Sequence, residues 1–138
     1  MKVVIDTSVL VFALVNKRGS AAKILSSIFD GKLKILYDNK ILFEYLEVLS
    51  NKSFGFNFEI VNDVMHFVRY EGAFNEAVFN SIDYPDVKFH DEADRKFWEV
   101  YKAGEANHLI TGNRKHFPED HAIMLPGEFI KAYEKHKP

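Results

Sequence analysis

Hydrophobic positions fall into short apolar runs and helix-spaced stripes that alternate along the chain. Residues 3–5 form a β-branched run typical of a buried strand, and the run stops at Asp6. Apolar residues recur at helical spacing over residues 20–29, and another short apolar run follows at residues 34–37. This alternation predicts an α/β sandwich with a mostly parallel central sheet.

The same pattern continues to the end of the chain. Further helices are expected at residues 9–16 (capped by Thr7 or Ser8), 39–49, 58–70, 91–103 and 128–135, and further strands at residues 77–79, 109–111 and 122–125. There is no internal repeat and no linker rich in proline or glycine. Residues 1–138 are therefore expected to form a single domain.

Composition narrows the class of protein. With 47% hydrophobic residues, a chain of 138 residues can bury a substantial core. The absence of cysteine excludes disulfides, a thiol nucleophile and a Cys-ligated zinc site, and it suits a reducing compartment.

Asp6 interrupts the apolar N-terminus, and no run reaches the roughly 18–20 apolar residues of a membrane span. We expect a soluble, cytoplasmic protein without a membrane association.

The net charge disfavours one kind of nucleic-acid binding. A net charge of −2 disfavours a protein that coats nucleic acid through many phosphate contacts. It does not exclude a nuclease, because a metal site requires carboxylates and the ion brings its own positive charge. The six histidines show no metal-ligand spacing, and His116 and His121 are expected to be loop residues.

One acidic residue lies where a solvated acid is not expected. Asp94 precedes the apolar stripe of its helix by three, four and seven residues, so it shares the inward face with Phe97, Trp98 and Tyr101. The opposite side is expected to carry Arg95, Lys96, Glu99 and Lys102. An inward carboxylate is costly unless it is paired or binds a metal. The alternative is a capping box, in which Asp91 caps the helix and the Asp94 side chain accepts a hydrogen bond from the Asp91 backbone amide in return.

Helical geometry also separates two glutamates. The helix at residues 39–49 has an apolar arc formed by Ile41, Leu42, Tyr45, Val48 and Leu49. Glu44 falls at the edge of this arc, whereas Glu47 points roughly opposite and is expected to be solvated. Glu44 is the better candidate for a site.

Two more polar residues follow predicted strands. Asp6 and Asn113 lie just past strand ends, and ligands of parallel sheets bind at the carboxyl ends of the strands. Asp6 has the alternative role of a helix cap, and Asn113 that of a turn residue, because Gly-Asn suits positive φ. Together with Glu44 and Asp94 they form an oxygen-rich set that suits Mg²⁺ or Mn²⁺ rather than zinc.

Four motifs in order resemble the PIN domain family, and more narrowly its toxin components from toxin–antitoxin pairs. They are Val-Val-Ile-Asp6-Thr7-Ser8-Val-Leu, Leu-Phe-Glu44-Tyr-Leu-Glu-Val-Leu, Asp91-Glu-Ala-Asp94-Arg-Lys-Phe and Leu-Ile-Thr111-Gly-Asn113-Arg-Lys-His-Phe-Pro, and the match extends to Pro126. The resemblance implies a three-layer α/β/α fold and a Mg²⁺- or Mn²⁺-dependent endoribonuclease. It also implies a cognate antitoxin and a homodimer.

The resemblance assigns roles to particular residues. Asp6, Glu44 and Asp94 match the family's metal-binding and catalytic acids. Asn113 stands at a fourth catalytic position that is often Asp, so the site lacks one negative charge and a second metal is left open. Thr7, Asp91 and Thr111 are expected to support the site, and Arg114 and Lys115 to contact the RNA backbone. The expected chemistry is phosphodiester hydrolysis by metal-activated water.

Parts of the sequence are also similar to two other classes of protein. The strand ending in Asp6-Thr7 is similar to the start of haloacid-dehalogenase phosphatases, but Ser8 stands where their second aspartate is required. The stronger alternative is a PIN-like module that binds RNA or protein without cutting, since Asn113 removes a charge from the site.

Overall fold

The computed structural model describes residues 1–74 and 86–135. Within them a parallel sheet of five strands has the order β3-β2-β1-β4-β5. The strands are β1 (Lys2–Ile5), β2 (Lys34–Tyr37), β3 (Ala73–Phe74), β4 (His108–Ile110) and β5 (Ile123–Met124). The predicted α/β class with a parallel sheet is confirmed.

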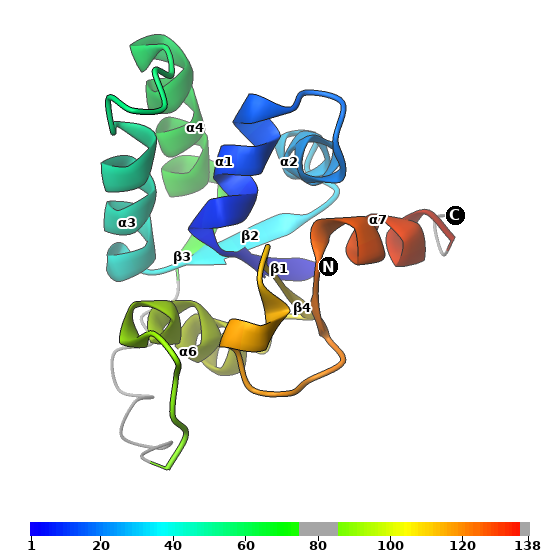
Figure 1. Cartoon of the computed structure of the whole chain (residues 1–138). Helices are drawn as coiled ribbons and strands as arrows, with labels where there is room; N and C mark the ends of the chain where they lie inside the picture. The colour runs from blue at the N-terminus through cyan, green and yellow to red at the C-terminus, as the bar shows by residue number, and fades with distance from the viewer. Residues whose placement is uncertain (75–85, 136–138) are drawn as a thin grey trace.

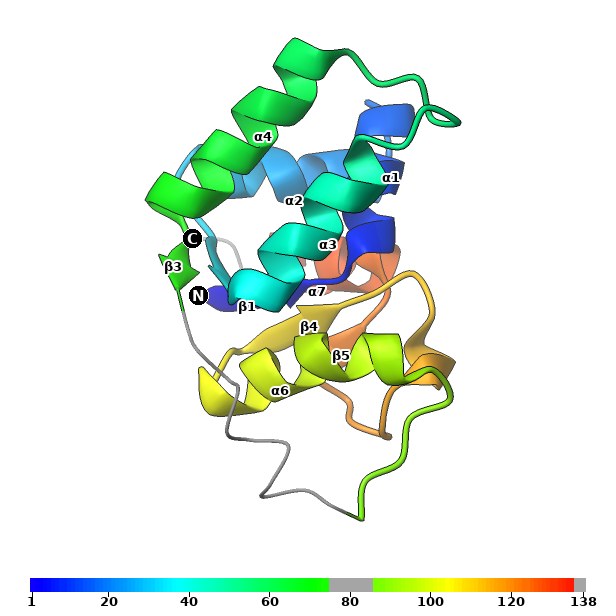
Figure 2. The ribbon, with the colours of Figure 1, turned by 90° about the vertical axis from the view of Figure 1, so that its left-hand side faces the viewer.

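Helices cover both faces of this sheet (Figures 1 and 2). One face carries α1 (Thr7–Val15), α2 (Ser20–Phe29), α3 (Asn39–Leu49), α4 (Phe58–Glu71) and α7 (Pro126–Lys135), and the other carries α6 (Arg95–Ala103). The three-layer α/β/α arrangement expected from the resemblance is therefore confirmed. In this fold the crossovers to β2 and β3 run over one face and the return to β4 brings α6 to the other.

The middle of the sheet is its most buried part. In β1, Val3, Val4 and Ile5 are fully buried, because helices pack on both faces of this central strand. The chain leaves β1 toward β2 and β3, and later returns to place β4 on the other side of β1. The carboxyl ends of β1 and β4 thus form a topological switch point, which is where α/β sheets bind ligands.

Several boundaries differ from the sequence prediction. The N-cap of α1 is Asp6, not Thr7 or Ser8, because the Asp6 carboxylate accepts a hydrogen bond from the Ser8 amide. The helix predicted at residues 91–103 begins with a separate 3₁₀ turn, η1 (Glu92–Asp94), before α6. The strand predicted at residues 77–79 lies outside the described residues, and β3 was not predicted.

No helix of residues 1–74 and 86–135 is long and apolar enough to cross a membrane. The longest helix of this part of the chain, α4, has 14 residues, whereas a span needs about 20.

Candidate metal centre

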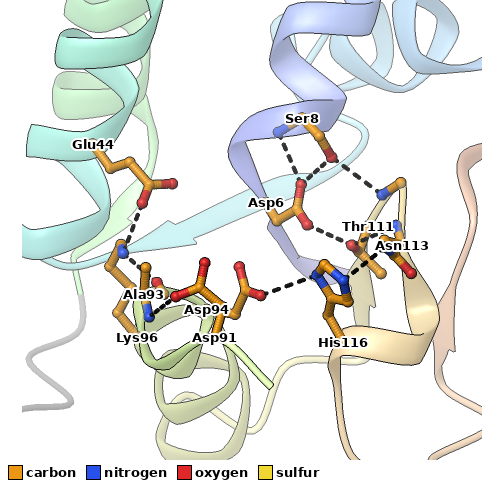
Figure 3. Close-up of polar contacts among 11 residues, drawn as sticks. Asp6, Ser8, Glu44, Asp91, Ala93, Asp94, Lys96, Thr111, Asn113 and His116 are labelled. Atoms are coloured by element: carbon orange, nitrogen blue, oxygen red, sulfur yellow. Dashed lines mark hydrogen bonds and ion pairs between the residues drawn. The ribbon is translucent and has the colours of Figure 1, made fainter. Parts of the chain in front are cut away.

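Asp6 lies at the carboxyl end of β1 and is only 8% exposed. Its Oδ1 accepts hydrogen bonds from the Ser8 amide at 2.9 Å and from the Ser8 hydroxyl, and its Oδ2 accepts one from the Thr111 hydroxyl. Thr111 is fully buried directly after β4, so this contact joins the ends of two adjacent strands (Figure 3). Asp6 is therefore a helix cap and also part of the cluster at the switch point.

Burial sets the electrostatics of Asp6. Desolvation raises the pKa of its carboxyl above the ordinary value, and the hydrogen bonds from Ser8, Thr111 and the Val9 amide oppose that rise. A carboxylate in this position is stabilised by any cation that approaches it.

Glu44 is positioned by the seating of α3 against β1. The hydroxyl of the neighbouring Tyr45 is fully buried and donates to the carbonyl of Ile5, the last residue of β1. The Thr7 hydroxyl donates to Glu44 Oε2, and Lys96 Nζ lies 2.7 Å from Glu44 Oε1. Glu44 is therefore turned toward the carboxyl end of β1.

Glu47 is exposed on the same helix, as the helical geometry predicts. The prediction that separated Glu44 from Glu47 is confirmed for their positions in the fold.

Asp94 ends the 3₁₀ turn η1 and faces the other acids across the end of the sheet (Figure 3). Its Oδ2 is buried and receives no hydrogen bond, and the nearest cationic partner given by the structure is His116 Nδ1 at 3.3 Å. That contact is an ion pair only when the imidazole is protonated. Burial raises the pKa of Asp94, as do Asp6, Asp91 and Glu44, while His116 lowers it.

Asp91 takes the capping role by itself. Its carboxylate accepts from the Ala93 amide at 2.9 Å, and its backbone carbonyl accepts from the Asp94 amide at 3.0 Å. The Asp94 side chain thus faces the acids at the end of the sheet, and the contacts of the described residues include no reciprocal capping-box bond from it. Asp91 remains within electrostatic range of Asp94.

Asn113 follows β4 but contacts a histidine rather than the acids. Its Nδ2 lies 2.9 Å from His116 Nε2, and its backbone amide donates to the Thr111 hydroxyl at 3.0 Å. Its φ is −143°, so the alternative of a positive-φ turn residue does not hold. The preceding Gly112 is closely surrounded, because a Cβ there would lie 2.7 Å from Phe12 Cε2 and 2.9 Å from Ser8 Oγ.

The two predicted RNA contacts lie in η2 (Arg114–His116). Arg114 pairs with Glu128 of α7, which draws its guanidinium toward that helix. Lys115 is exposed. Their contact with RNA stays a prediction.

Three residues of the centre were missed by the sequence reasoning. Lys96 was expected on the outer side of its helix, yet its side chain is only 15% exposed and its ammonium binds Glu44. His116 was expected to be a loop residue, yet it contacts Asp94 and Asn113. Ser8 was considered only as a helix cap, yet its hydroxyl links Asp6 to the Gly112 amide.

Helical spacing predicts only the direction in which a side chain leaves the backbone. Lys96 was missed because its long side chain can reach back across the helix. Glu99, also expected outside, is buried at 4% exposure. For His116 the only sequence signal was its place three residues after Asn113.

The donor chemistry of the cluster fits a hard divalent cation. Asp6, Glu44 and Asp94 offer carboxylate oxygens from three separate elements, and the buried Oδ2 of Asp94, which lacks a hydrogen bond, is the kind of polar atom that a cation satisfies. However, no three acidic or histidine side chains of residues 1–74 and 86–135 are already gathered closely enough to hold an ion. In this structure Glu44 is paired with Lys96, and Asp94 lies against His116.

Comparisons with known proteins identify the family of the chain and a solved structure with a similar fold. The model of the family described as PIN domain matches residues 2–115. A chain of the crystal structure of VapBC2 from Rickettsia felis, bound to a DNA fragment from their promoter, is similar with a TM-score of 0.56 and 17% sequence identity. The similarity covers 90% of this chain and 97% of that chain. No protein with a curated description matches the sequence significantly.

Proposed function

The chain belongs to the PIN domain family, and from this premise we propose that it is an endoribonuclease that depends on Mg²⁺ or Mn²⁺. The ligands of the ion are Asp6, Glu44 and Asp94. The observation that carries the proposal is the Asp94 carboxylate at the end of the sheet. Its Oδ2 is buried without a hydrogen bond and lies 3.3 Å from His116 Nδ1, and Asp6 and Glu44 act on the same carboxyl electrostatically.

The chain's own groups prepare this centre for an ion. The Thr111 and Ser8 hydroxyls orient the two oxygens of Asp6, and the Thr7 hydroxyl orients Glu44. Asp91 holds the turn that presents Asp94. A bound divalent ion would activate a water molecule and neutralise charge that develops on the phosphodiester.

Three residues that follow β4 complete the site in this proposal. Asn113 lies at the rim, where its amide keeps His116 beside Asp94. Lys115 is exposed next to it and contacts the RNA backbone, while Arg114 does so only after leaving Glu128.

Matched variants on α3 test the ligand assignment. E44Q keeps the shape of the side chain but removes its charge, and we expect cleavage of labelled RNA with Mn²⁺ to fall by about 10²-fold or more. E47Q makes the same change at an exposed position three residues on and should cleave like the wild type. Equal rates for both variants would remove Glu44 from the centre.

A non-cleaving PIN-like module that binds RNA or protein is the second candidate. It is favoured by the Lys96–Glu44 ion pair and by the lack of three gathered ligands among the described residues. Calorimetry separates the two candidates, because an inactive module should give no Mn²⁺ binding heat and no metal-dependent rise in melting temperature.

We further propose that the protein is the toxin of a toxin–antitoxin pair in the cytoplasm. The resemblance of its motifs to PIN-family toxins and the fold that it shares with the VapBC2 chain support this. A groove between α3 and α4 offers apolar surface to a protein partner, with Phe43 74% exposed; it is lined by Leu42, Phe43, Leu46, Met65 and Tyr70 among others.

Co-expression tests the toxin assignment. The product of a neighbouring small gene should co-purify with the chain and suppress its cleavage of RNA; a product that binds without effect on cleavage would argue against it. Homodimerisation, also proposed, is read from the molar mass in solution.

A further inference from the structure

Lys96 is held unusually firmly for a lysine at the edge of a site. Its ammonium lies 2.7 Å from Glu44 Oε1, donates to the Ala93 carbonyl, and sits 5.3 Å from the centre of the Phe97 ring. The side chain is 15% exposed, so little of it remains in solvent. A lysine side chain normally keeps its ammonium group in water. The energetic cost of partly burying the Lys96 ammonium is offset by the groups that it contacts.

The ammonium also acts on a second carboxylate. Asp38 is buried at the end of β2 and caps α3. Burial raises the pKa of Asp38, while its bond from the Ile41 amide and the charges of Lys40 and Lys96 oppose that rise. Lys96 therefore supplies positive charge to the acids of α3 from the opposite layer of the fold.

The charge balance of the centre depends on this residue. Asp6, Glu44 and Asp94 carry three negative charges when ionised, and Lys96 is paired with one of them, Glu44, which leaves the carboxylates of Asp6 and Asp94 without a lysine or arginine partner among the ion pairs of the described residues. At the rim, Asn113 contributes no charge and its amide faces His116. A second divalent ion would meet the ammonium of Lys96 at Glu44 and would find no fourth carboxylate at position 113.

We propose that the Lys96 ammonium takes the place of a second metal ion in this centre. It positions and neutralises Glu44, so that the protein works with a single divalent ion. This rests on the metal-dependent function proposed above. Lys96 is a positioning residue that acts through Glu44.

Calorimetric titration with Mn²⁺ alone, without RNA, tests the proposal. The wild type is expected to bind one Mn²⁺ per chain. K96M removes a positive charge beside the ion, so its Mn²⁺ affinity should rise by about tenfold or more. K96R keeps the charge and should bind Mn²⁺ like the wild type.

Two controls isolate the effect. K102M makes the same change of net charge on the same helix, where Lys102 lies over the Trp98 ring instead of the acids, and should leave Mn²⁺ affinity unchanged. In the E44Q background, K96M should no longer raise the affinity, because its partner is already neutral. K96Q serves in place of K96M if circular dichroism shows that K96M is unfolded.

The outcomes separate the two proposals. Two Mn²⁺ ions bound per wild-type chain, or equal affinities for the wild type and K96M, would overturn the role of Lys96 and leave the metal-dependent function standing. A wild type without Mn²⁺ binding would overturn both.

Discussion

Replacing Tyr45 with phenylalanine tests whether one buried hydroxyl holds α3 against the end of β1. Tyr45 is fully buried and its hydroxyl donates to the Ile5 carbonyl. Burial, Asp6, Glu44 and Asp38 raise the pKa of Tyr45 well above its ordinary value, so the hydroxyl keeps its proton and remains a donor. The substitution removes only this group and keeps the ring beside Phe97, at 6.3 Å between ring centres.

The expected cost follows from the contact that is lost. A net hydrogen bond contributes about 0.5–1.5 kcal/mol, and a buried group left unpaired costs about 1–3 kcal/mol. We therefore expect Y45F to lower the free energy of unfolding by about 1–2 kcal/mol, which corresponds to about 3–7 °C in melting temperature for a chain of this length. RNA cleavage should fall as well, because Glu44 is carried by the same turn of α3.

Urea denaturation of the metal-free protein measures this cost. Y70F is the matched control, since Tyr70 is 64% exposed on α4, and it should change the free energy of unfolding by less than about 0.5 kcal/mol. If Y45F is as stable as Y70F, the hydroxyl does not seat α3 and the account of how Glu44 is positioned fails.

Three further predictions concern the end of the sheet. T111V removes the hydroxyl that donates to Asp6 and should lower the free energy of unfolding by about 1–2 kcal/mol, measured in urea. G112A places a Cβ 2.7 Å from Phe12 Cε2 and 2.9 Å from Ser8 Oγ, so the half-exposed Phe12 ring must move and the Ser8 hydroxyl is displaced from Asp6. The free energy of unfolding should fall by about 1 kcal/mol, and F12A in the same chain should recover part of that loss. Folding raises the pKa of Asp6 above 3.8, so the charged carboxylate destabilises the folded state of the metal-free protein. The free energy of unfolding of the wild type should therefore fall relative to that of D6N as the pH rises from about 4 to about 7. A difference between the two proteins that does not change with pH would contradict this.

The sequence was sufficient for the layers of the fold because the hydrophobic pattern reports burial directly. Residues 34–37 and 20–29 were placed correctly as β2 and α2. The β3 strand was missed, since its two residues, Ala73 and Phe74, are too short a run to show a period.

The positions of the acids followed from backbone geometry, but their partners did not. Helical spacing turned Glu44 inward and Glu47 outward, and the structure agrees. It could not foresee that the flexible side chain of Lys96 reaches Glu44, or that His116 meets Asp94 across two elements. Such contacts depend on rotamers and on long-range packing, which a linear pattern does not contain.

Metal-dependent cleavage at Asp6 is measured most directly by comparing RNA cleavage by wild type and D6N with Mn²⁺ and with excess chelator. Asn at position 6 still caps α1 but lacks the charge that binds the ion. We expect cleavage by the wild type with Mn²⁺, none with chelator, and a loss of about 10²-fold or more in D6N. Undiminished cleavage by D6N, or cleavage that persists in chelator, would contradict it.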